Sequence, residues 1–102
     1  MNITTTNGFD GITIREYKGM VFGEIIAANS LSANIANPFI GITGGRASAI
    51  ENEFNTMRNT AVNEMIERAK NMGANAVVGV RVDVDELLGY VMVTASGTAV
   101  VI

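Results

Sequence analysis

The stretch IENEFNTMRNTAVNEMIERAKNMG, residues 50–73, decides the fold because it predicts the one long helix on which this short chain can build a core. Its apolar residues recur at spacings of three and four, the period of a helix with one buried face. Ser48 followed by Glu51 matches a capping box at the start, and Gly73 is the C′ residue expected at the end. The stripe consists of Ile50, Phe54, Met57, Ala61, Met65, Ala69 and Met72, widened by Val62 and Ile66.

Strand patterns flank this helix on both sides. Residues 12–28 precede it and are rich in β-branched and aromatic residues, with Gly19 and Gly23 expected at a bend or bulge. Residues 77–85 and 90–102 follow it, and each alternates with a period of two. In the first of these, one face is expected to carry Val78, Val80, Val82 and Val84.

Strand, helix, strand and strand predict one α/β domain of the α+β kind over residues 1–102. The expected architecture is a two-layer split β-α-β-β unit with one long helix. Its sheet is mostly antiparallel, and the last strand is inserted between the other two in the order first, third, second.

Residues 20–26 are apolar on both faces of the first predicted strand. A single helix covers only one face of a sheet, so the other face needs a different cover. We assign it to a contact with another subunit, and the residues expected there are Met20, Phe22 and Ile26. Residues 29–47 offer an alternative, because they can fold back over this face with Leu31, Ile35 and Phe39.

Composition favours self-association and disfavours nucleic acid as a partner. Hydrophobic residues make up 48% of a chain of only 102 residues, which leaves a small domain with apolar surface to hide. The formal net charge is −3, whereas binding to a phosphate backbone needs clustered positive charge. The N-terminal sequence has no basic and apolar leader, and no run approaches the roughly 18 apolar residues of a membrane span. A cytoplasmic homo-oligomer without a membrane contact is expected.

The absence of two residue types excludes several kinds of reaction. The chain has no cysteine and no histidine, which removes thiol nucleophiles, thiolate metal sites and the commonest general base. We therefore expect a non-catalytic protein whose cofactor and small ligand the sequence leaves unknown. The alternative is an enzyme or metal-dependent catalyst whose site forms between subunits, from Arg46, Glu24 and the acidic residues after position 82.

The sequence GGRAS, residues 44–48, is a candidate anion site. Two glycine amides and a helix start can hold an anion, and an arginine can add a charge-assisted hydrogen bond. The residues concerned are Gly44, Gly45, Arg46 and Ser48. The structural interpretation is favoured, in which the glycines only allow a sharp entry to the helix and Ser48 caps it.

The sequence DVDE, residues 83–86, is a candidate site for a hard cation. Asp83 and Asp85 share a face of the predicted strand, and Glu86 is expected at the following turn. No glycine-punctuated calcium loop accompanies them, and Arg81 on the same face supplies a compensating charge. A solvated acidic edge is therefore the favoured interpretation.

Four motifs resemble the YbjQ-like family of small uncharacterised bacterial and archaeal proteins. They are MVFGE at 20–24, GGRAS at 44–48, MGANAVVGV at 72–80 and VTASGTAVV at 93–101. The resemblance implies a subunit related to the dodecin-type fold, assembled as a ring-shaped homopentamer. It also implies heavy-metal binding, although soft metals prefer the thiolate and imidazole ligands that this chain lacks. It transfers no catalytic residue.

Overall fold

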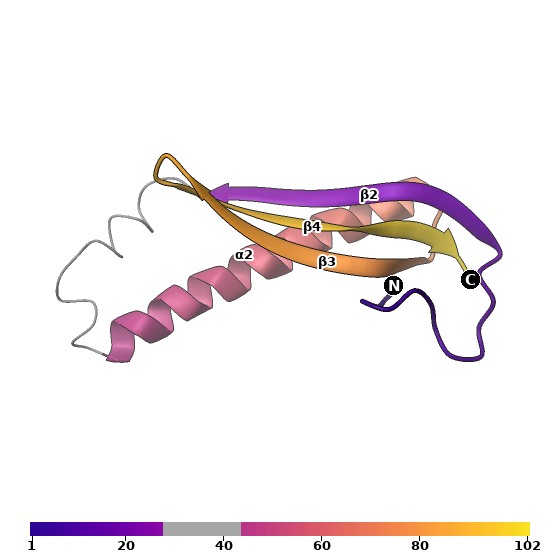
Figure 1. The fold of residues 1–102 in the computed structure, drawn as a ribbon, viewed down its shortest axis with the longest axis horizontal. Coiled ribbons are helices and arrows are strands. Elements are labelled where there is room, and N and C mark those ends of the chain that lie inside the picture. Colours follow the sequence, from indigo (N-terminus) through magenta and orange to yellow (C-terminus); the bar gives the residue numbers. More distant parts are fainter. Residues whose placement is uncertain (28–43) are drawn as a thin grey trace.

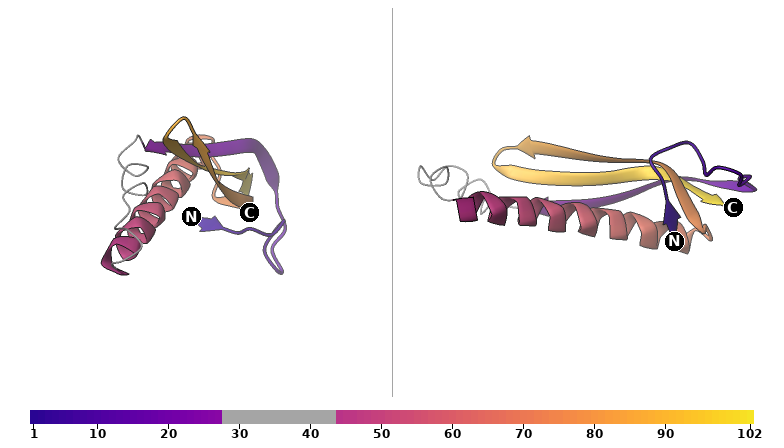
Figure 2. Two further views of the ribbon diagram at one scale, coloured as in Figure 1. Left: turned by 60° about the vertical axis from the view of Figure 1, so that its left-hand side comes forward. Right: turned by 90° about the horizontal axis from the view of Figure 1, so that it is seen from below.

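In the part of the chain that the structure describes, one long helix packs on one face of a four-stranded sheet (Figures 1 and 2). A computed structural model describes residues 1–27 and 44–102, with the backbone alone described for residues 44–50 and 87. The elements are β1 (Asn2–Ile3), β2 (Glu16–Ala27), α2 (Gly44–Asn71), β3 (Ala76–Leu87) and β4 (Tyr90–Val101). Leu31, Ile35 and Phe39 lie outside the described residues, and with them the alternative cover by residues 29–47.

The predicted helical stripe is the face that packs on the sheet. Its central members are buried, and they lie one helical turn apart: Met57, Ala61, Met65 and Ala69. Gly73 ends the helix as predicted, with a φ of 83°. The amide of Gly73 donates to the Lys70 carbonyl at 2.9 Å, and the amide of Ala74 donates to the Ala69 carbonyl at 3.1 Å. These two bonds form a Schellman motif.

The helix start was predicted wrongly. α2 begins at Gly44, so Ser48 lies inside the helix and not at its N-cap. A cap residue has non-helical backbone angles, which Ser48 does not have here. The predicted capping box between Ser48 and Glu51 is therefore absent.

The sheet order differs from the predicted three-strand order because a fourth strand is present. The order is β1-β3-β4-β2, with β4 antiparallel to both β2 and β3, and β1 parallel to β3. β1 has only two residues, too few for any alternation to be visible in the sequence. After β1 the chain stays beside β3, where the Gly79 amide donates to the Thr6 carbonyl at 2.8 Å.

Two hydrophobic clusters cover different parts of the two sheet faces. The larger lies between α2 and the sheet and includes Val21, Val77, Val80, Val93 and Ala95. The smaller consists of Ala76, Val78 and Val100, with Phe9, Ile14 and Ile102 packed against it. Because Phe9 and Ile14 belong to the segment before β2, that segment covers one end of the face that α2 does not cover.

A bulge in β3 breaks the predicted valine face. The pairing with β4 shifts between Val78 and Arg81, where Gly79 has a φ of 61°. Val78 consequently joins the smaller cluster, and Val80 joins the larger one on the other side. Val82 and Val84 follow Val80 on the helix side but are 38% and 46% exposed, because α2 packs mainly on β2 and β4.

At Gly23 the backbone of β2 lies directly against the backbone of α2. A Cβ atom on Gly23 would lie 1.9 Å from the Ala61 carbonyl oxygen and 2.6 Å from the Met65 amide nitrogen. Both neighbours are helix backbone, which no rotamer change can move. Gly23, which was predicted at a bend or bulge, is therefore needed for a direct contact between backbones. The β2 bulge lies at Gly19, the other glycine predicted there, where the pairing with β4 shifts.

Gly23→Ala should destabilise the fold, because the added methyl group forces α2 away from β2. We expect the free energy of unfolding to fall by about 3 kcal/mol, the upper end for overpacking. Urea unfolding followed by far-ultraviolet circular dichroism, at a fixed protein concentration, measures the change. Gly8→Ala is the matched control, with no atom within 4 Å of the new methyl group. Equal midpoints for the two variants would contradict the contact.

Candidate functional site

The face of the sheet that points away from α2, called the open face here, exposes large apolar side chains along β2. Val21 and Ile25 pack toward the helix, so alternation sends the residues between them to the other side. Met20, Phe22 and Ile26 are 72%, 40% and 62% exposed. The structure therefore brings together, on one face, the three residues that the sequence assigned to a subunit contact.

Hydroxyl side chains run along β4 beside these apolar residues. Three registered pairs lie on the open face: Met20 with Thr98, Phe22 with Ser96, and Glu24 with Thr94. On the far side of β4, Asp83 also pairs with Thr94. Glu24 and Asp83 thus stand two strand spacings apart, about 10 Å. The open face therefore combines the apolar side chains of β2 and the hydroxyl groups of β4 with charged side chains at Glu24 and on β3.

A pocket of 640 Å³ lies where β3 turns back into β4. Its volume falls in the range of small-molecule sites. Its lining is mostly apolar and consists of Ile26, Asp85, Glu86, Leu88, Tyr90 and Met92. Of these six residues, only Ile26 was predicted from the sequence to lie on a contact surface. The remaining members meet there because the hairpin returns beside the end of β2, which is a tertiary arrangement.

The turn beside this pocket has an unusual residue. Leu88 and Gly89 connect the paired residues Leu87 and Tyr90, and their φ angles are 53° and 80°. Two positive φ angles define a type I′ turn, which prefers asparagine, aspartate or glycine at its first central position. Leu88 holds this conformation while its side chain is 86% exposed.

The predicted carboxylate trio is only partly brought together. Asp83 and Asp85 share the open face, and both are exposed. Glu86 is paired with Val91, a member of the helix-side cluster, so it lies on the opposite face. It was predicted at the turn, but β3 continues to Leu87. Arg81 Nη2 lies 3.7 Å from a carboxylate oxygen of Asp83 and supplies the compensating charge.

The predicted anion site lies within the helix. Gly44 and Gly45 belong to the first turn of α2, and Arg46 follows them there. The side chains of Arg46 and Ser48 lie outside the described part of the structure.

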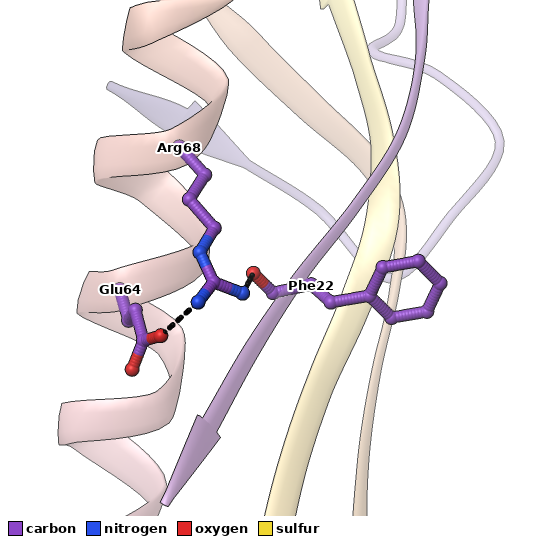
Figure 3. A network of polar contacts seen from close by, with 3 residues as sticks. All are labelled: Phe22, Glu64 and Arg68. Atoms are coloured by element: carbon purple, nitrogen blue, oxygen red, sulfur yellow. Dashed lines mark hydrogen bonds and ion pairs between the residues drawn. The ribbon is translucent and has the colours of Figure 1, made fainter.

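Arg68 connects α2 to β2, a contact that the sequence analysis missed (Figure 3). Its Nη1 donates to the Phe22 carbonyl oxygen at 2.9 Å, and its Nη2 forms an ion pair with Glu64. Figure 3 shows the Phe22 ring pointing away from the helix while its carbonyl faces Arg68. The spacing of four between Glu64 and Arg68 indicates an ion pair. Nothing in that spacing identifies the strand that lies beside it.

The donor groups of this chain do not fit a soft heavy metal. Such metals prefer thiolate and imidazole, and the sequence, with no cysteine and no histidine, offers only the thioethers of its 6 methionines as soft donors. Within residues 1–27 and 44–102, no three acidic side chains gather closely enough to hold an ion. Over the same residues, no helix has the length and apolar character needed to cross a membrane.

Three comparisons relate the chain to known proteins. A model of the family described as "Putative heavy-metal-binding" matches residues 1–102. A "UPF0145 protein" of Corynebacterium jeikeium (strain K411) is 48% identical over 102 residues, covering 98% of this chain and 97% of that protein. A "UPF0145 protein" of Acetivibrio thermocellus is 48% identical over 106 residues, covering 100% and 99%.

The fold also resembles a crystal structure. A protein of unknown function from Pediococcus pentosaceus ATCC 25745, which belongs to the DUF74 family, superposes with a TM-score of 0.66. The match covers 100% of this chain and 97% of that one at 21% sequence identity. A similarity at this identity concerns the fold alone.

Leu88→Asn should stabilise the subunit, because asparagine tolerates a positive φ better than leucine. We expect the free energy of unfolding to rise by about 1 kcal/mol in urea titrations at fixed concentration. Leu88→Ala is the control, since it shortens the exposed side chain but leaves a residue that does not favour a positive φ. An equal gain in both variants would mean that the side chain and not the φ angle is responsible.

Isothermal titration with zinc or copper(I) should show only weak association with carboxylates or thioethers. Asp83→His combined with Asp85→His is the positive control, because two imidazoles on one strand face should bind zinc measurably. A nanomolar zinc site in the unaltered protein would overturn the argument from its donor groups.

Proposed function

Because this chain belongs to the YbjQ-like family described as "Putative heavy-metal-binding", over residues 1–102, we propose that it acts as a non-catalytic cytoplasmic homo-oligomer. Its subunits meet at the open face, and a ring-shaped pentamer is the assembly that the family resemblance implies. Since its donor groups do not fit a soft heavy metal, the proposed role rests on assembly. The assembled protein then offers a site for a small ligand or ion.

One observation carries this proposal: α2 covers a single face of the sheet and leaves Met20, Phe22 and Ile26 exposed on the other. Apolar side chains that stay in water lose the free energy that burial provides, about 25 cal/mol per Å². Exposed apolar side chains that gather on one face of a folded domain mark an interaction surface, and here Glu24 alone interrupts the row between Phe22 and Ile26. A second copy of the same chain is the partner that is always present.

The shape of the subunit supports the same conclusion. Its radius of gyration is 16.6 Å, whereas a compact domain of 100 residues has about 13 Å. An elongated chain buries less of its own surface than a compact one. Association with other copies covers part of the remainder.

The charged groups support a role without catalysis. Among the described residues no polar or charged side chain is buried. A carboxylate or amine that acts as general acid or base near neutral pH needs burial or a strong neighbouring charge to shift its pKa. The net charge of −3 in turn favours a protein partner over nucleic acid.

The assembly is tested directly by size-exclusion chromatography with light scattering at micromolar concentration. A stable multiple of the subunit mass is expected, and a monomer would overturn the proposal. Native mass spectrometry of protein purified without chelator then gives the number of subunits and the mass of any retained ligand.

Phe22→Glu should dissociate the assembly while leaving the subunit folded. The Phe22 ring points away from α2, so the fold does not need it, but a carboxylate in a buried contact costs several kcal/mol, about 2–7 for an unpaired polar group. Light scattering gives the mass, and circular dichroism gives the retained helix. Phe22→Leu is the matched control and should keep the assembly. An intact oligomer for Phe22→Glu would show that this side chain reaches water.

A further inference from the structure

β2 lies at one edge of the sheet, so one of its long sides pairs with no other strand of the described chain. Its register with β4 is regular from Gly19 to Ala27. The Phe22 carbonyl goes to Arg68 and therefore points to the free side. Backbone groups alternate along an antiparallel strand, so Met20, Glu24 and Ile26 also direct their amides and carbonyls to this free edge.

The composition of this edge is typical of a strand that pairs with a strand of another chain. The sequence MVFGEIIA, residues 20–27, is apolar and rich in β-forming residues, contains no proline and carries one charge. Exposed edges of this kind template pairing with another chain.

The outer edge of β3, on the side away from β4, is protected in a different way from residue 81 onward. This part of the edge lies beyond the part of the strand that the N-terminal segment accompanies, and four of its residues are charged: Arg81, Asp83, Asp85 and Glu86. Charged side chains at an edge discourage pairing. β2 lacks such a row, so its protection has to come from another element.

Arg68 occupies the middle of the β2 edge. Its Nη1 lies 2.9 Å from the Phe22 carbonyl oxygen, the acceptor that an incoming strand would use, and Glu64 holds the guanidinium in place. The Arg68 side chain is 50% exposed, so its charge stays hydrated at the edge. A strand that paired with β2 would have to displace this group and its hydrogen bond.

We propose that Arg68 blocks the free edge of β2 against strand addition by a second copy of this chain. Arg68 thereby prevents contacts through the backbone groups of the edge. Self-association is then limited to contacts between side chains, which the open face provides. The block of the edge does not depend on the oligomer proposed above.

The test compares Arg68→Ala with the unaltered protein in a concentration series, using light scattering and thioflavin T fluorescence. We expect larger, heterogeneous, thioflavin-positive assemblies with the helical signal retained in circular dichroism. Arg58→Ala is the matched control, because Arg58 lies on the same helix and bonds to Asn55, one turn away, and not to a strand. It should behave as the unaltered protein does.

A second substitution tests whether the larger assemblies form through the β2 edge. In the Arg68→Ala background, Glu24→Pro removes an edge-facing amide and should restore the mass and fluorescence of the unaltered protein, whereas Glu24→Ala should not. If Glu24→Pro fails to fold, Ile26→Pro tests the next edge-facing amide by thioflavin T fluorescence alone, because Ile26 also belongs to the open face and its replacement changes the mass of the oligomer.

Two results would overturn the proposal. The first is an Arg68→Ala variant with unchanged mass and fluorescence, and the second is a proline double variant that assembles as Arg68→Ala does. A monomeric unaltered protein would overturn the proposed oligomer and leave this comparison valid.

Discussion

The contact between the backbones of α2 and β2 at Gly23 is the constraint on which the rest of the structure depends. Because the helix backbone lies directly on this strand, it is held over β2 and β4 and cannot also cover the outer half of β3. Ala61 at the crossing keeps the layers close. The same approach brings Arg68 within reach of the β2 edge, and it leaves the Phe22 ring on the face that α2 does not cover.

Local patterns were enough to predict the helix and the three long strands. A period near 3.6 identified α2, a period of two identified the strands, and Gly73 correctly marked the helix end. The same alternation placed Met20, Phe22 and Ile26 on one face, so this part of the candidate site followed from the sequence. In each case the neighbours that determine the structure are a few positions away in the chain.

The remaining features depend on partners that are distant in sequence. β1 exists because β3 offers it an edge, and the Gly79 bulge moves Val78 to a face that simple alternation does not predict. Glu86 was expected beside Asp83 because β3 was expected to end earlier. The role of Arg68 needed knowledge of which strand passes the helix. Pairing, bulges and strand ends are set by tertiary packing, which short windows of sequence do not contain.

The central position of β4 also has a consequence for the order of folding. β2 hydrogen-bonds to no other described strand, and its partner residues, 91–101, lie at the far end of the chain. During synthesis, β2 and α2 therefore leave the ribosome well before the strand that joins them to β3. Until β4 arrives, α2 is the main partner of β2 among the described elements, so the sheet closes late, through contacts of high sequence separation that are slow to form.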